Sequence, residues 1–261
     1  MSPLDPTLAR PRTDLPFLRT RIRALAPPVA APATVSAPAA AAAAVTISSS
    51  LDLSVPAAPK KRGAAPARRR PSPRRAASGA QTLLSAREPT VTLTRLQSGL
   101  GKLTVEAACS AAVGDLRLGC AFSLRGGHTS TVQHEGGNRN GSLDGKTLVL
   151  QAQRHEFETV VIDLRHCREI ERLMFYAFSA TRAPLAWAGT LLVTTYGEAS
   201  LEAPLELSEP SPVAALLTVY QVGGELVLRR EMRPFATTVK AACLAYGYDR
   251  ITWLDDWTPT S

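Results

Sequence analysis

The stretch VAALLTVYQVGGELVLRREM (213–232) is typical of a β-hairpin. Its two arms, 213–222 and 225–232, are rich in apolar and β-branched residues, and Gly223-Gly224 connects them. A primed two-residue turn needs positive φ at both central residues, which glycine adopts without steric cost. The stretch therefore predicts two antiparallel strands.

Similar strand patterns occupy most of the chain from residue 89 onward. The clearest is DLRLGCAFSL (115–124), whose alternation places apolar side chains on one face and Arg117 and Ser123 on the other. The other expected strands are 91–96, 102–107, 147–153, 157–164, 172–180, 187–196 and 201–207. One late helix is expected between Pro234 and Gly247, since proline favours the first helical turn and glycine the end.

These patterns predict a mainly β protein, an antiparallel β-sandwich with one C-terminal helix. Its hydrophobic seam is expected to contain Leu116, Leu118, Phe122, Leu173, Phe175, Leu191, Val193, Leu217, Val219, Leu226 and Leu228.

The first third of the chain has a different composition. Residues 1–88 hold 14 of the 30 Lys and Arg but only 4 of the 22 Asp and Glu, a net charge of +10, and 13 of the 20 prolines. Alanine dominates their apolar content and buries too little surface to offset about 1–2 kcal/mol of backbone ordering per residue. We therefore predict a disordered, basic Ala/Pro/Arg-rich arm over 1–88 and one domain over 89–261. The domain carries −2, which excludes a basic nucleic-acid-binding core.

Basic clusters in the arm are candidates for binding an anionic partner, a nucleic acid or an acidic membrane surface. They are Lys60, Lys61, Arg62, Arg68, Arg69, Arg70, Arg74 and Arg75. A solubilising linker is the alternative interpretation.

Common catalytic and structural-metal motifs are absent from the sequence. The four cysteines contain no C-x-x-C pair, and no nucleophile elbow, phosphate-binding loop or H-E-x-x-H occurs. No apolar run reaches the roughly 18 residues of a membrane-spanning helix. We expect a non-enzymatic protein of the cytoplasm, with peripheral membrane attachment or membership of a larger assembly as further options.

Three stretches resemble a known family. They are EGGNRNG (135–141), the strand pair RLMFYAFSA and WAGTLLVTTYG (172–180, 187–197), and the segment 215–253. Over roughly 110–257 the chain resembles the TerD-like superfamily of tellurium-resistance and stress-response proteins, with most similarity to its TerA-type branch. The resemblance implies a calcium-binding β-sandwich without enzymatic activity, which works in bacterial stress assemblies at the inner face of the membrane.

The calcium ligands that this resemblance implies are incomplete. Calcium needs six to eight oxygen ligands, several of them from carboxylates. Arg117 stands where a second acid is expected, Gly137 replaces an acid, and Lys146 follows where further acids are usual. The remaining ligand candidates are Asp115, Glu135, Asn138 and Asp144. Two interpretations stay open: weak calcium binding, or a polar turn stabilised by Asn and Gly.

The sequence thus predicts a binding or scaffold component of a tellurium-resistance-like stress assembly. Its calcium site is degenerate, and no other cofactor is expected. Its partners are expected to be other proteins of that assembly. The alternative is a tether in which the basic arm binds an anionic polymer and the sandwich is a passenger or an oligomerisation unit.

Overall fold

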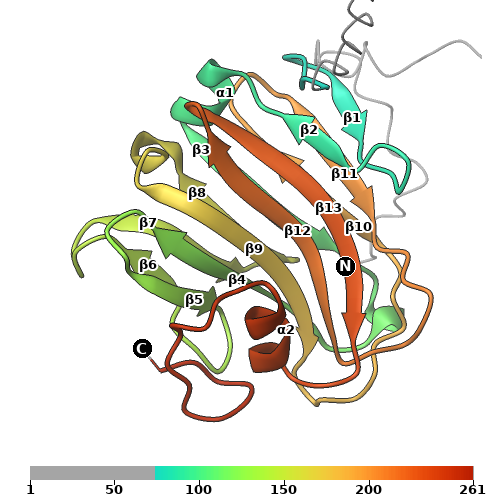
Figure 1. Cartoon of the computed structure of the whole chain (residues 1–261). Helices are drawn as coiled ribbons and strands as arrows, with labels where there is room; N and C mark the ends of the chain where they lie inside the picture. The colour runs from blue at the N-terminus through green and yellow to red at the C-terminus, as the bar shows by residue number, and fades with distance from the viewer. Residues whose placement is uncertain (1–73, 261) are drawn as a thin grey trace, which may run out of the picture. The chain divides into compact units, whose positions relative to one another are not determined.

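The computed structural model describes residues 74–260, in which two β-sheets pack face to face (Figure 1). In spatial order the first sheet contains β1 (Gln81–Leu83), β11 (Ser200–Pro204), β10 (Thr190–Thr194), β3 (Lys102–Ala108), β8 (Glu158–Asp163), β7 (Leu148–Arg154) and β6 (Asn140–Ser142). The second contains β2 (Thr90–Thr92), β13 (Glu225–Phe235), β12 (Val213–Val222), β9 (Ile170–Ser179), β4 (Leu116–Leu124) and β5 (Thr129–Gln133). All strand pairs are antiparallel except β1 with β11, so the predicted mainly β sandwich is confirmed.

The core lies between the two sheets. All eleven side chains of the predicted seam belong to one buried apolar cluster, to which both sheets contribute. The hairpin prediction is also confirmed, because β12 and β13 pair up to Val222 and Glu225, and Gly223 and Gly224 have φ of 60° and 86°.

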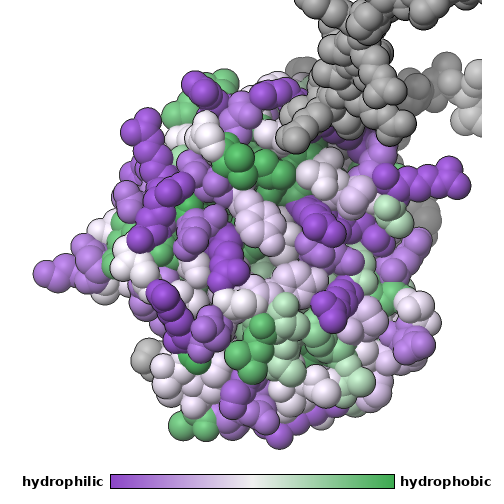
Figure 2. Space-filling view, in the orientation of Figure 1, coloured by the Kyte–Doolittle hydropathy of each residue, from purple (hydrophilic) through white to green (hydrophobic). Residues whose placement is uncertain are grey.

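A second, smaller apolar cluster covers the outer face of the second sheet, where helix α2 (Val239–Ala245) lies (Figure 1). Met174 and Tyr176 of β9 belong to this cluster together with Val239 and Cys243 of the helix. The C-terminal aromatic residues close this cluster: Tyr248 is buried, and Trp253 is half-buried against it. On the face shown in Figure 2, polar side chains surround the apolar groups that are exposed at the surface.

The predicted boundary at residue 88 is wrong. Strand β1 pairs with β11, and Ala76 and Leu84 are part of the core. Residues 74–88, which composition assigned to the arm, therefore belong to the folded part. Pairing with the distant strand β11 and burial of Ala76 and Leu84 attach this segment, and the composition of the segment reveals neither contact.

Two further expectations differ from the structure. The Gly- and Asn-rich stretch 136–146, whose composition is typical of a loop, contains strand β6, and the expected strand 91–96 is split into β2 and a short helix α1 (Arg95–Gly99). Thr94 and Gln97 form a capping box that begins this helix.

Helix α2 also begins later than expected, after Thr238 rather than at Pro234. Strand β13 continues to Phe235, beyond the last residue that β2 pairs with. Pro234 therefore lies outside the part of β13 that pairs with β2, so the N–H that proline lacks costs no hydrogen bond to β2. Two 3-10 turns, η3 (Ala111–Val113) and η4 (Leu164–His166), complete the elements of residues 74–260. Within these residues, neither α1 nor α2 is long and apolar enough to cross a bilayer.

Candidate functional site

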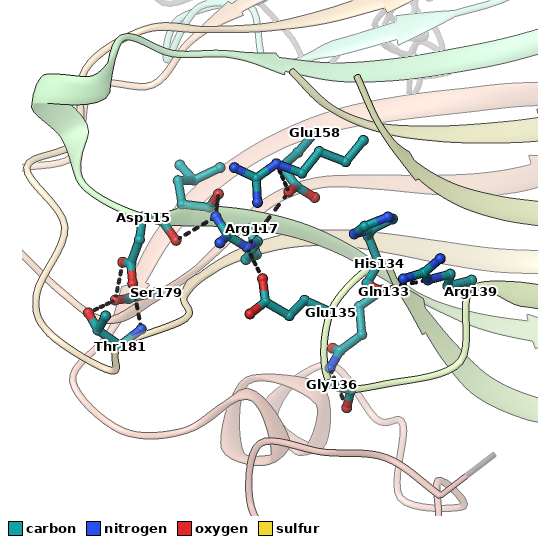
Figure 3. A network of polar contacts seen from close by, with 12 residues as sticks. Asp115, Arg117, Gln133, His134, Glu135, Gly136, Arg139, Glu158, Ser179 and Thr181 are labelled. Atoms are coloured by element: carbon teal, nitrogen blue, oxygen red, sulfur yellow. Dashed lines mark hydrogen bonds and ion pairs between the residues drawn. The ribbon is translucent and has the colours of Figure 1, made fainter. Parts of the chain in front are cut away.

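Polar side chains from four strands and their ends converge at one end of the sandwich (Figure 3). Asp115 precedes β4, Arg117 lies in β4, Glu135 follows β5, and Glu158 begins β8. We call these residues, together with Arg154 of β7, the Arg117 network. Neighbouring strands bring them together although they are separated in the sequence.

Arg117 is the centre of the network. Its Nε donates to a carboxylate oxygen of Glu135 and lies 3.8 Å from Glu158 Oε1. Its Nη1 donates to the backbone carbonyls of Asp115 at 3.3 Å and Leu116 at 3.1 Å. The side chain is only 14% exposed. The residue that stands in place of an expected acid therefore supplies a fixed positive charge among the remaining carboxylates.

Asp115 is held by the last residue of β9 and by the turn that follows this strand. Its Oδ1 accepts a hydrogen bond from the Ser179 hydroxyl at 2.7 Å, and its Oδ2 accepts one from the Thr181 amide at 2.6 Å. Partial burial alone would raise the pKa of Asp115, but these hydrogen bonds outweigh it and hold the pKa below its ordinary value. Both carboxylate oxygens thus have partners within the protein.

Asn138 and Asp144 each stabilise their own turn. Asn138 Oδ1 accepts from the Asn140 amide at 3.1 Å. Asp144 Oδ1 accepts from the amides of Lys146 at 2.9 Å and Thr147 at 2.6 Å, which lowers the pKa of Asp144. These are the local contacts of Asx turns.

The four candidate calcium ligands thus have separate partners: Asp115 in the Ser179 segment, Glu135 on Arg117, and Asn138 and Asp144 in their own turns. Within residues 74–260, no group of three or more His, Cys, Asp and Glu side chains is placed to hold a metal ion.

Sequence reasoning missed two buried polar residues that shape the 134–139 loop. The Tyr176 hydroxyl donates to Gln133 Oε1 at 2.8 Å, and Gln133 Nε2 donates to the carbonyl of Gly136 at 3.1 Å. A Cβ at Gly137 would lie 2.9 Å from the Gln133 amide carbon, so glycine is required for this close approach. No local pattern marks Gln133, because its partner Tyr176 lies on another strand.

Glu158 was also missed, although the sequence contains a signal for it. In FETVVIDL (157–164), Glu158 shares the strand face of Val160 and Ile162, both fully buried. Glu158 is 5% exposed, and neither of its carboxylate oxygens makes a hydrogen bond. Burial raises the pKa of Glu158, against the lowering effects of Arg117, of the Leu118 amide, which lies near the carboxylate but outside hydrogen-bonding geometry, and of Arg154.

Two of the eight basic residues predicted to bind an anionic partner are held by the folded part. Arg74 lies 2.8 Å from Glu88, and Arg75 makes a bidentate pair with Glu225 at 2.8 and 3.0 Å. Their assignment to a free arm is therefore corrected. The other six, Lys60, Lys61, Arg62, Arg68, Arg69 and Arg70, lie outside the described residues.

The cysteines are held as thiols. Cys120 and Cys243 are fully buried, and burial raises the pKa of both. Cys109 is half-buried near the Arg117 network, and burial raises its pKa to about 11. The thiolate is the nucleophilic form, so none of these three thiols is activated at neutral pH.

No family model matches the chain, and no curated protein matches it. The solved structures that are similar to it include the following two. One is the crystal structure of a protein of unknown function, with 15% identity and a TM-score of 0.37. The other is a homologue of the telluride resistance protein TerD from Streptomyces coelicolor A3(2), with 16% identity and a TM-score of 0.41. Each similarity covers 53% of this chain and 92% of the other. Similarity of this degree assigns no activity, ligand or partner.

Proposed function

We propose that the chain is a non-enzymatic binding or scaffold component of a tellurium-resistance-like stress assembly, of the TerA type. The observation that carries this proposal is the ion pair between Arg117 and Glu135. It neutralises both charges within the site, so that neither is available to a substrate. The stress-assembly part rests on the sequence resemblance over 110–257.

The chemistry of the site supports a role without catalysis. A nucleophile needs an adjacent base or a lowered pKa. In residues 109–158 the half-buried thiol has a raised pKa, and the Asp115 carboxylate already accepts two hydrogen bonds. A module of this kind acts through its surface, by holding partners.

The proposed calcium site is degenerate, with weak or lost binding. A divalent ion would need several free carboxylate oxygens. At this site it would also have to displace the Arg117 guanidinium from Glu135 or share the carboxylate with it. Repulsion between the two cations opposes such sharing.

The assembly proposal is tested in the host cell with the tagged full-length chain. After exposure to tellurite and mild crosslinking, we expect the chain to be recovered in a complex well above the mass of a monomer. A chain that remains monomeric with and without tellurite contradicts the proposal.

A matched variant separates the proposal from the arm-tether alternative. In it, Lys60, Lys61, Arg62, Arg68, Arg69 and Arg70 are all replaced by Ala. If this variant still joins the complex, contacts of the sandwich carry the assembly. If it is lost from the complex, the basic arm carries it.

A further inference from the structure

A pocket of about 320 Å³ opens beside the Arg117 network. Its walls come from the end of β3, the η3 turn, the start of β4 and the β7–β8 hairpin. The volume is at the lower end of what small-molecule sites enclose, about 300–1,000 Å³. The pocket is therefore large enough for a side chain or a small ligand.

Glu158 forms the buried wall of this pocket, and Figure 3 shows it beside Arg117. Arg154 Nε and Arg117 Nε lie 3.4 and 3.8 Å from its Oε1. Neither contact is a hydrogen bond, and Oε2 has no hydrogen-bond partner either. A buried carboxylate without hydrogen bonds is costly, so a ligand that donates to it would gain free energy.

The charges around the pocket favour a cationic donor. Asp115, Glu156 and Glu158 line it with three negative charges, and Arg117 and Arg154 with two positive ones. Arg117 is already committed to Glu135, which lies outside this lining. The net charge of the pocket lining is therefore negative. An anionic ligand would meet the carboxylates of Glu156 and Glu158 but only one available guanidinium, that of Arg154.

We propose that this pocket binds a primary alkylammonium group, either a lysine side chain of a polypeptide or a free polyamine. An ammonium carries three N–H donors and no acceptor, which matches the two Glu158 oxygens, because neither accepts a hydrogen bond. Its alkyl stem would lie against the apolar parts of Ala107, Leu116 and Phe157, which also line the pocket. This inference does not depend on the proposed function.

Arg154 acts as an internal competitor for the ammonium. Its side chain is 45% exposed and, among the described residues, its ion pair is with Glu158 alone. An incoming ammonium therefore has to displace this guanidinium from Oε1. Removing the arginine should strengthen binding, whereas removing the carboxylate charge should weaken it.

The test is calorimetric titration of the full-length chain with two probes, cadaverine and Nα-acetyl-lysine N-methylamide, and with 1-pentanol as the uncharged control. We expect saturable binding of at least one amine and none of 1-pentanol. Glu158→Gln should weaken amine binding by about tenfold or more, because a charge-assisted hydrogen bond is lost. Arg154→Ala should tighten it severalfold. Binding of cadaverine alone identifies a free polyamine, and binding of the lysine derivative alone identifies a polypeptide side chain.

Two results would overturn the proposal. One is the absence of saturable amine binding by both the wild type and Arg154→Ala. The other is an unchanged affinity in Glu158→Gln. Thermal unfolding of each variant shows whether it is folded, and Arg154→Ala keeps the test decisive if Glu158→Gln does not fold, because Arg154 lies at the surface.

Discussion

Gly119 in β4 lies beneath the ring of Tyr176, the neighbouring residue on β9. A Cβ at this position would come within 2.6 Å of the Tyr176 hydroxyl oxygen, and Tyr176 is fully buried. We predict that Gly119→Ala lowers the free energy of unfolding by about 1–3 kcal/mol, the usual cost of overpacking a core.

Urea unfolding measures this change, with Gly126→Ala as the matched control. A Cβ at Gly126 has no neighbour within 4 Å. Equal stability of the two variants would show that the Tyr176 ring is free to move aside.

Asp115 and Glu158 should make opposite contributions to the pH dependence of stability. The pKa of Asp115 is lowered in the folded state, so its contribution is present above the ordinary value of 3.8 and is lost as the pH falls through the lowered pKa. The pKa of Glu158 is raised, so the folded state binds the extra proton, and stability falls as the pH rises from 4.5 through the raised pKa.

Unfolding free energies at several pH values between about 3 and 7 test these signs. As the pH falls, the wild type should lose stability relative to Asp115→Asn. As the pH rises, the wild type should lose stability relative to Glu158→Gln. Parallel curves for the wild type and Glu158→Gln would contradict the burial of a carboxylate without hydrogen bonds.

The sequence allows only part of this site to be predicted. Arg117 is recognisable as a cation among candidate ligands, and its ion pair with Glu135 follows from proximity across β4 and β5. The partners of Asp115 and Gln133 lie 64 and 43 residues away. Such pairs depend on strand order and register, which one sequence without its fold does not determine.

At the scale of elements, β1 shows how few apolar residues attach an edge strand. Leu84, just after β1, is fully buried, and its amide donates to the Glu202 carbonyl at 2.7 Å. We predict that Leu84→Ala costs about 2–5 kcal/mol, as for other core leucines.

The adjacent Leu83 provides the control, because it is 51% exposed. Leu83→Ala should change the stability by no more than about 0.5 kcal/mol. If Leu84→Ala is as mild as Leu83→Ala, the segment 74–88 does not contribute to the fold.

Long alternating strands were predictable, whereas short elements were not. Strands β4, β9, β12 and β13 have nine or more residues, enough for alternation to identify the buried face. Strands β1, β2 and β6 have three residues each, and tertiary pairing rather than pattern determines them.

At the scale of the whole molecule, the charge of the first third predicts salt-sensitive binding. Replacing Lys60, Lys61, Arg62, Arg68, Arg69 and Arg70 by Ala in the full chain should abolish binding to duplex DNA or acidic vesicles at low salt. Arg74→Ala with Arg75→Ala should have little effect, because both side chains are paired with Glu88 and Glu225. Binding that survives the six substitutions would identify the arm as a spacer.

We infer that Arg117 supplies the positive charge that the carboxylates of this site would otherwise take from a metal ion. Calorimetric titration of the chelator-stripped full-length chain with calcium tests it most directly. We predict no binding tighter than about 0.1 mM, the range of poorly charged sites. A dissociation constant in the low micromolar range would contradict this role of Arg117, because calcium would then compete successfully with its guanidinium.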